Sequence, residues 1–411
     1  MKSDITTYAI VGAGGRARSM FGRPIVSEFQ EHARLVGICD IELARAELMS
    51  RDCGGNIPAY ADFDEMIAAC KPDTVIVTTD DAFHHEYIIR ALESGCDAIT
   101  EKPMTIDAAK CTAILEAERR TGKTVKVTFN CRFMPYVVRV KELLASGAIG
   151  DIQSVHLEWF LDRRHGASYF RRWHSRMDNS GGLLVHKSTH HFDMVNWWLD
   201  DEPEQLHAFG DLRVYGQPDK QQGTRCRDCD SRSTCEFYYD MNELAAAKSF
   251  YLEGDYIRDA CVFRGDIDIY DTMSVQVKYA RGALLSYSLT AYNPMEGWKA
   301  SFVGSRGRIE AEQFNSGPHQ GEATQSIRLY NVNQELVTII APKASGGHGG
   351  GDSRLRRMLF VGDQPDPLGQ QAGSRAGAMS MLIGAGANVS IAERRPVSIR
   401  ELLQVHGTSY P

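Results

Sequence analysis

Side chains able to do chemistry are concentrated in residues 181–193, which read GGLLVHKSTHHFD. The titratable members of this stretch are His186, Lys187, His190, His191 and Asp193. The apolar continuation MVNWWLD predicts a single helix that begins after the two glycines. Because residues four apart share a helix face, His186, His190 and Asp193 would form one stripe, with Lys187 and His191 beside it. Buried imidazoles suit acid–base chemistry near neutral pH, and a purely structural helix would show the same pattern.

A second signal lies near the N-terminus, where the β-rich run TYAIV leads into GAGGRA. Gly12 would permit a tight turn, Gly14 would let the backbone approach a pyrophosphate, and the small Ala17 would allow close packing of helix and strand. Gly15 and Arg16 lie in the same loop, ahead of a helix whose N-terminus can bind phosphate. The spacing predicts a dinucleotide-binding fingerprint. A glycine-rich turn in an unrelated α/β protein is the alternative.

The acid expected at the ribose is Asp40, which ends the next strand-like run, RLVGICD. A carboxylate there accepts hydrogen bonds from both ribose hydroxyls and repels a 2′-phosphate, which favours NAD over NADP. Arg16 could still pair with a phosphate, so NADP stays open as an alternative.

Two further motifs follow the third and fourth strand-like runs. Their polar members are Thr79, Asp81, His84, Glu101 and Lys102. Because ligands of open α/β sheets bind at the carboxyl ends of the strands, all five are expected at the cofactor. A lysine at this place can also donate to a substrate hydroxyl and stabilise a developing alkoxide.

The elements that must position these residues change character along the chain. Strands alternate with helices up to about residue 130, which predicts a parallel Rossmann sheet and an NAD-binding domain over 1–130. Period-two hairpins then predict an α+β domain over 131–411 with a large, mostly antiparallel sheet. Within it we expect an insertion at about 217–262 and a C-terminal helix at about 374–388. The fold class is therefore α/β with two domains.

The segments VGAGGRARS, TTDDAFHHEYIIRALESG, EKPMT, NCRF and GGLLVHKSTHHFD, in this order and spacing, resemble the glucose–fructose oxidoreductase/inositol dehydrogenase/MocA (Gfo/Idh/MocA) family. The resemblance implies an NAD(P)-dependent dehydrogenase of sugars or cyclitols that forms a homo-oligomer, a dimer or a tetramer. It assigns contact with the reacting hydroxyl to Lys102 and removal of the hydroxyl proton to His190. Many members carry an aspartate where this chain has His186, which can relay protons or donate to an anion.

The function expected is therefore an NAD-dependent oxidoreductase that moves a hydride from a ring hydroxyl of a sugar, or of an anionic sugar derivative, to nicotinamide. Some members that this chain resembles use NAD for transient oxidation at C3, followed by elimination, which cleaves a glycoside without net redox change. The extra titratable groups His186, Lys187 and His191 suit that second reaction. A third alternative is a non-catalytic dinucleotide-binding regulator, which the pairing of Lys102 with His190 disfavours.

Arginines and aromatic residues precede the histidine stretch and are expected on the substrate side. They are Arg163, Arg164, Tyr169, Arg172 and Trp173, and Lys187 and His191 are expected to join them. Aromatic rings stack on sugars and guanidinium groups pair with carboxylate or sulfonate, although a solvated loop with salt bridges has the same composition. His348, in the Gly-rich loop 346–351, is expected either to close over the site or to lie in a surface turn.

Four cysteines fall in or next to a polar insertion: Cys226, Cys229, Cys235 and Cys261. The C-x-x-C spacing followed by further cysteines suits tetrahedral thiolate coordination of a structural zinc. An iron–sulfur cluster uses similar ligands, and four free thiols are the simpler alternative. A metal held by His186 and His190 is a weaker alternative, because the glutamate of an HExxH motif is absent.

Composition restricts the remaining partners. The chain of 411 residues has a net charge of −7, which gives no reason to expect nucleic acid or an anionic membrane surface. No apolar run reaches the roughly 18 residues of a membrane span. The N-terminal MKSDITTYAIVG resembles no signal peptide, so a cytoplasmic location is expected. The expected partner is a small carbohydrate.

Overall fold

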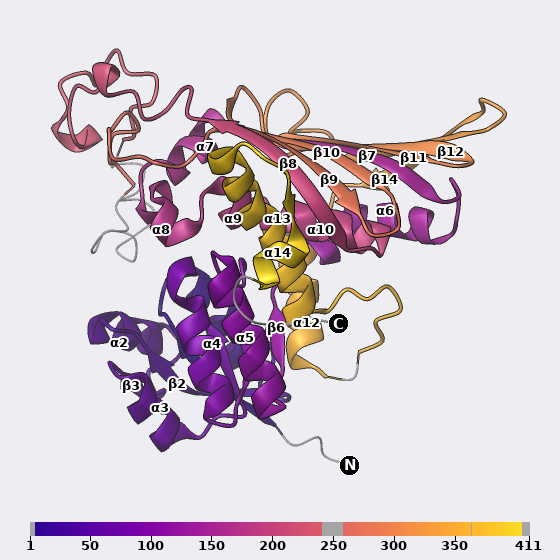
Figure 1. Cartoon of the computed structure of the whole chain (residues 1–411). Coiled ribbons are helices and arrows are strands. Elements are labelled where there is room, and N and C mark those ends of the chain that lie inside the picture. Colours follow the sequence, from indigo (N-terminus) through magenta and orange to yellow (C-terminus); the bar gives the residue numbers. More distant parts are fainter. Residues whose placement is uncertain (1–4, 241–257, 363, 405–411) are drawn as a thin grey trace.

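The computed structural model describes residues 5–240, 258–362 and 364–404, which form two sheets with helices packed around them (Figure 1). The first sheet has seven strands in the order β15-β6-β5-β4-β1-β2-β3. They span β1 (Thr6–Val11), β2 (Ala33–Cys39), β3 (Ala59–Tyr60), β4 (Thr74–Val77), β5 (Asp97–Thr100), β6 (Val125–Val127) and β15 (Ala372–Gly373). All pairs are parallel except β15 with β6, which confirms the expected Rossmann sheet.

Helices connect these strands, as the alternating pattern predicts. They are a π-helical turn η1 (Ala17–Gly22), α1 (Arg23–Ser27), α2 (Leu43–Asp52), α3 (Phe63–Cys70), α4 (His84–Glu93) and α5 (Ala108–Thr121). The Asp62 and Asp107 side chains each accept a backbone N–H, at 2.9 Å, and so cap α3 and α5. Gly122, with φ of +68°, ends α5 in the left-handed conformation that glycine adopts without strain.

The second sheet has nine strands in the order β14-β13-β12-β11-β7-β10-β9-β8-β16. They span β7 (Ile152–Asp162), β8 (Pro203–Asp211), β9 (Thr272–Tyr279), β10 (Leu284–Asn293), β11 (Gly297–Gly304), β12 (Gly307–Phe314), β13 (Thr324–Asn331), β14 (Leu336–Pro342) and β16 (Val397–Ser398). Only β7 and β10 pair in parallel. The mostly antiparallel sheet expected from the hairpins is therefore confirmed.

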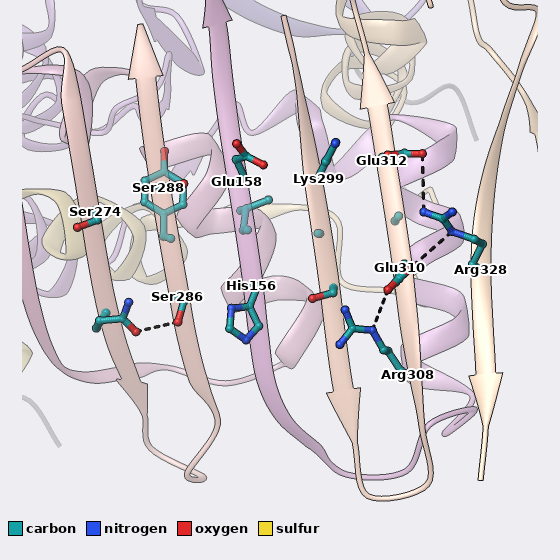
Figure 2. Close-up of a pocket in the computed structure, with 16 residues that line it drawn as sticks. His156, Glu158, Ser274, Ser286, Ser288, Lys299, Arg308, Glu310, Glu312 and Arg328 are labelled. Carbon is teal, nitrogen blue, oxygen red and sulfur yellow. Dashed lines mark hydrogen bonds and ion pairs between the residues drawn. The ribbon is translucent and has the colours of Figure 1, made fainter. Parts of the chain in front are cut away.

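The two faces of this sheet differ in polarity. In β9, Met273, Val275 and Val277 are buried, whereas the intervening Ser274 and Gln276 are exposed. Figure 2 shows the polar face, where serines, glutamates and basic residues of adjacent strands line a shallow hollow of about 590 Å³. The apolar face packs on helices that include α6 (Pro135–Ala145), α10 (Thr189–Leu199) and α13 (Ser374–Glu393). The last of these begins where expected and continues to Glu393.

One expected helix is two helices. Residues 183–199 form α9 (Leu183–His186) and α10, separated at Lys187 and Ser188. The backbone N–H and side-chain hydroxyl of Ser188 both donate to the carbonyl oxygen of Leu183, which turns the chain at this point. The prediction that His186, His190 and Asp193 share one helix face is therefore wrong, because His186 lies on α9 and the other two lie on α10.

Segments late in the chain return to the first sheet. Helix α12 (Gly351–Phe360) lies beside the Rossmann sheet in Figure 1, and Phe360 packs on Tyr8 and Phe29 with ring centroids 5.2 and 5.3 Å apart. Part of the expected insertion, residues 241–257, lies outside the described residues. Within the described ranges, no helix has the length and apolar character needed to cross a membrane.

Close packing between α13 and α9 depends on one glycine. A Cβ at Gly384 would lie 2.2 Å from the carbonyl oxygen of Leu184. A Cβ at Gly386 would instead meet side-chain ends, those of two leucines at 3.0 and 3.1 Å and of a valine at 3.6 Å. Alanine at either position gains about 1 kcal/mol of helix propensity. We therefore expect Gly384→Ala to be less stable than Gly386→Ala by about 2 kcal/mol, a typical cost of overpacking.

Urea unfolding midpoints of these two variants and the wild type measure the difference. Because Leu184 and His186 share α9, Gly384→Ala is also expected to lose activity, which Gly386→Ala retains. Equal midpoints for the two variants would contradict the proposed role of the close approach.

Candidate active site

The glycine loop after β1 has the shape that a dinucleotide requires. Gly12 has φ of +88°, and a Cβ there would lie 2.7 Å from the backbone of Thr78. A Cβ at Gly14 would meet no atom within 4 Å, so this side of the loop is open to a ligand. Gly15 follows in the first helical turn. The loop therefore presents its backbone to a pyrophosphate, as expected from the spacing.

Asp40 lies at the end of β2, against this loop. Its carboxylate accepts from the backbone N–H of Ala13 at 2.8 Å and of Glu42 at 2.9 Å. These two bonds fix the carboxylate beside the open side of the loop, where a ribose would lie. The arrangement fits a nicotinamide dinucleotide.

Arg16 does not project freely from the loop. Its guanidinium donates to Glu101 at 2.7 Å and to Asp352 at 3.1 and 3.3 Å. Burial opposes the charge on Arg16, but these two carboxylates outweigh it and raise the pKa of the guanidinium. Two carboxylates thus occupy most of the donors that a 2′-phosphate would need.

The strand-end motifs meet through a buried histidine. The His84 ring lies between the carbonyl oxygens of Pro103 and Thr79, at 2.8 and 2.9 Å, and burial lowers its pKa. It ties the turn after β4 to the turn after β5. His84 and the Thr79 carbonyl are thereby engaged with protein atoms, and Lys102 emerges beside them.

Contacts among three residues connect the two domains: Lys102 and Asp81 of the first and His186 of the second. The Lys102 ammonium donates to the carbonyl oxygen of His186 at 2.8 Å, and His186 Nδ1 contacts a carboxylate oxygen of Asp81. Burial and the charge of Lys187 lower the pKa of Lys102 to about 8, against the opposing effect of Asp81. Burial also lowers the pKa of His186 and raises that of Asp81. A histidine of the second domain is thus held by a carboxylate of the first.

His190 lies next to this group, on α10. It is 5% exposed, and its ring packs on Phe129 and faces His348, with centroids 6.0 and 6.3 Å apart. Nδ1 has no hydrogen-bond partner among the described residues. Burial, followed by the charges of Lys102 and Lys187, lowers its pKa well below the usual range. The imidazole is therefore neutral at pH 7 and able to accept a proton.

His174 is a member of the cluster that the sequence analysis missed. Its ring stacks on Trp173 at 3.7 Å and meets His186 edge-on at 4.4 Å. The rings of Tyr169 and Trp173 also lie 5.5 and 5.7 Å from that of His186. The sequence signal was the run YFRRWHS, of which only Tyr169, Arg172 and Trp173 were expected at the site.

Lys187 and His191 point toward the large sheet. His191 stacks on Trp159 at 3.6 Å and its Nδ1 lies 2.8 Å from the hydroxyl of Tyr287. The Lys187 ammonium lies 5.6 Å from the Trp159 ring. Partial burial opposes its charge, but the nearby Tyr169 and Glu296 raise its pKa, so it is a half-buried cation. His191 thus packs in the core, and Lys187 places a positive charge next to the histidines.

Two of the three arginines expected on the substrate side are engaged elsewhere. Arg163 pairs with Glu236 at 2.6 Å and lies over the Phe237 ring. Arg164 lines a separate cavity of about 290 Å³. Arg172 bonds to Ser168 within its own turn, and its charge adds to burial in lowering the pKa values of His174 and His186. The structure therefore brings Arg172, Tyr169 and Trp173 to the histidines.

The expected structural zinc is not supported. Cys226, Cys229, Cys235 and Cys261 line one small cavity, but no group of three or more His, Cys, Asp or Glu in the described ranges is placed to hold a metal ion. This result equally leaves the iron–sulfur and two-histidine alternatives unsupported. Hydrogen bonds from buried Arg171 to Ala260 and Cys226 hold the segment instead.

A Rossmann sheet with an open glycine loop, next to a buried lysine and neutral histidines, defines a nicotinamide-dependent oxidoreductase. Residues 6–129 match the family model described as "Oxidoreductase family, NAD-binding Rossmann fold". Residues 141–399 match the model "Oxidoreductase family, C-terminal alpha/beta domain". The chain belongs to the Gfo/Idh/MocA oxidoreductase family, as the motifs predicted, and is an enzyme of that type.

Individual relatives are similar to different degrees. YteT of Bacillus subtilis, whose name marks it as an oxidoreductase, is 39% identical over 96% of this chain and 98% of its own length. The D-glucoside 3-dehydrogenase of Escherichia coli is 28% identical over 48% of this chain and 56% of its own length. The WlbA dehydrogenase of Bordetella pertussis, solved with NADH and UDP-GlcNAcA, shares the fold with a TM-score of 0.67 at 15% identity, covering 96% of this chain and 98% of that one.

Burial of neutral histidines makes stability depend on pH. His174, His190 and His191 have folded pKa values well below the usual 6.5 because burial disfavours the imidazolium. Below pH 6.5 the unfolded chain binds protons that the folded chain does not. Each histidine therefore contributes stability that is present above pH 6.5 and lost below it, at about 1.4 kcal/mol per pH unit.

Urea unfolding of the apoprotein between pH 7.5 and 5.0 measures this slope. We expect His191→Phe, which keeps a ring against Trp159, to reduce the slope by about 1.4 kcal/mol per pH unit. Comparison with the wild type cancels the titration of all other groups. Identical slopes would mean that His191 is protonated in the folded protein.

Proposed function

We propose that this protein is an NAD-dependent oxidoreductase that transfers a hydride from a ring hydroxyl of a sugar, or of a sugar derivative, to nicotinamide. The observation that carries the proposal is the presence of half-buried Lys102 and buried, neutral His190 in one cluster, where burial and then the charge of Lys102 lower the pKa of His190. The names of relatives, among them D-glucoside 3-dehydrogenase and inositol 2-dehydrogenase, support a polyhydroxylated substrate.

The roles follow from charge and position. Lys102, whose pKa is about 8, is charged at neutral pH and donates a hydrogen bond to the hydroxyl oxygen, stabilising the alkoxide as it forms. Neutral His190 accepts the hydroxyl proton. When bound, the nicotinamide accepts the hydride. Asp40 favours NAD over NADP, because its carboxylate repels a 2′-phosphate and Arg16 is engaged by two carboxylates.

An anionic sugar fits the cluster best. Lys187 is a half-buried cation, and among the described residues no carboxylate lies within ion-pair distance of it. A charge withdrawn from water is normally paired, so a carboxylate on the substrate would stabilise Lys187. Tyr169 and Trp173 supply aromatic surface beside His186, whereas Arg163 and Arg164 are engaged away from the cluster.

A second reaction is favoured by the contact between Asp81 and His186. This pair, with His174 edge-on to it, supplies an acid–base group in addition to His190. Oxidation at C3 of a glycoside would acidify the C2 proton, which this second group could remove. Elimination of the aglycone, addition of water to the C1=C2 double bond so formed, and return of the hydride to C3 would then hydrolyse the glycoside without net redox change.

One experiment distinguishes these reactions. The wild type is incubated with NAD and a panel of sugars, uronates and their glycosides while NADH absorbance and aglycone release are both followed. Accumulation of NADH indicates the dehydrogenase, and aglycone release without NADH indicates the redox-neutral reaction. NAD binding without either product across the panel would overturn the proposal and leave the regulator.

Variants then test the assigned base. His190→Asn is expected to lower kcat by a factor of about 10² to 10⁴, the usual contribution of a general base, with little change in NAD affinity. His207→Asn, on β8 of the large sheet, is the matched control and should retain full activity. Near-normal turnover of His190→Asn would show that another group removes the proton.

We also propose that the protein forms a two-fold dimer through the open face of the large sheet. Charges of both signs lie on this face: Glu158, Glu310, Glu312, Lys299, Arg308 and Arg328 (Figure 2). A surface with mixed charges can complement a second copy of itself across a two-fold axis, whereas it complements no single-sign partner.

Sedimentation equilibrium tests this interface. Among the residues that the structure describes, no carboxylate forms an ion pair with Lys299. Lys299→Glu should therefore weaken the dimer without breaking an ion pair within one subunit. Ser274→Ala, on the same face, is the control and should leave it intact. A wild-type monomer at micromolar concentration, or an unaltered dimer in Lys299→Glu, would contradict the proposal.

A further inference from the structure

The Gly-rich loop 346–351 crosses from one half of the molecule to the other at the site. It follows β14 of the large sheet and leads into α12, which packs on the Rossmann core (Figure 1). A Cβ at Gly351 would lie 2.5 Å from the carbonyl oxygen of Asn130, so the loop lies directly on the segment after β6. The loop is thereby fixed at its α12 end, close to both the cofactor loop and the histidines.

Asp352, at the start of α12, holds this junction together. Its carboxylate accepts from Arg16 at 3.1 and 3.3 Å, from the Asn130 amide at 2.7 Å, and contacts His348 Nδ1 at 3.1 Å. Burial opposes the charge, but His348 and Arg16 hold the pKa of this carboxyl well below its usual range. Asp352 is therefore ionised at neutral pH, and it links its own loop to two segments distant in sequence.

His348 has a conformation that few residues other than glycine adopt. Its φ is +48°, and Gly349 and Gly350 follow with φ of +54° and +82°. Its side chain is 45% exposed, in contrast to the buried histidines, yet its ring centroid lies 6.3 Å from that of His190. Because Nδ1 contacts Asp352, the other ring nitrogen, Nε2, is left for a ligand that enters between solvent and the base.

The same carboxylate reaches the cofactor loop. Arg16 follows the glycines that present the backbone to a pyrophosphate, and it also binds Glu101, the neighbour of Lys102. A single chain of contacts thus runs from the dinucleotide loop through Arg16 and Asp352 to His348. Strain at a non-glycine residue in the left-handed region persists where surrounding contacts fix it, and Asp352 supplies that contact.

We propose that His348 is a substrate-binding residue, whose Nε2 hydrogen-bonds a sugar hydroxyl beside the one oxidised, and that Asp352 is the positioning residue that holds it there. Asp352 also contacts Arg16, so binding of a dinucleotide at the glycine loop is coupled to the position of His348. The inference rests on the proposed function, because it takes a polyhydroxylated ring as the ligand. It assigns to the Gly-rich loop a direct part in sugar recognition.

A double-mutant cycle tests the proposal, with the sugar that gives most NADH in the panel as the probe. His348→Asn should raise the KM for that sugar about 10-fold, as expected for one lost hydrogen bond, with kcat changed less than 3-fold. Asp352→Asn should raise the same KM by a similar factor, although it does not contact the sugar. The double variant should be no worse than Asp352→Asn alone, because both changes remove one interaction.

Coupling to the cofactor gives a readout that a purely structural role would not change. In wild type, the factor by which the sugar tightens NADH binding, measured by NADH fluorescence, should exceed about 5, and Asp352→Asn should bring it near 1. Ser353→Ala, at the next residue of α12, is the matched control and should keep both KM and coupling.

The outcomes separate this inference from the proposed function. If the wild type forms neither NADH nor free aglycone with any member of the panel, the proposed function and this inference fall together. If the wild type turns over but His348→Asn keeps its KM, or the two losses in KM multiply, only the role of His348 and Asp352 is overturned. Loss of kcat alone in Asp352→Asn would assign it to the fold rather than to the sugar.

Discussion

Lys102 is half-buried, and the partners of its ammonium group come from both halves of the molecule. It emerges from the Rossmann sheet, donates to the backbone of His186 in the second domain, and lies beside Asp81, which contacts the same histidine. An ion removed from water costs several kcal/mol unless such partners are in place. The two domains must therefore be packed against each other before the charge on Lys102 is stabilised. The other features of the cluster depend on this packing.

Close backbone contacts make this packing possible. Gly384 lets α13 approach α9, which carries His186, and Gly351 lets α12 approach the segment after β6. Helix α12 then packs Phe360 into the Rossmann core. Helices α12 and α13, from the end of the chain, thus cover the contact between the two domains. The histidines at this contact are shielded from water as a result. Their depressed pKa values are a consequence of this packing rather than of any single neighbour.

Sequence patterns predicted the parts of the fold that depend on interactions between residues close in sequence. The glycine loop, the strand ends carrying Asp40 and Lys102, and the one-sided antiparallel sheet all follow from spacing and periodicity. The contact between Asp81 and His186 joins residues 105 positions apart, and no periodicity marks such a pair. The break at Ser188 depends on a bond back to Leu183, and the place of Arg163 depends on Glu236 in the insertion. These features depend on particular side-chain contacts in the folded chain, which sequence patterns alone do not determine.

Charge explains why one cluster is compatible with two reactions. At neutral pH Lys102 and Lys187 are cations and the histidines around them are neutral, so the interior favours negative charge on a substrate. Simple oxidation develops that charge as an alkoxide, and elimination after oxidation develops it as an enolate. The same lysines would stabilise both oxyanions. The group that distinguishes the two reactions is then His186. Its contact with Asp81 would determine whether His186 acts as a second base toward a carbon-bound proton or only orients His190.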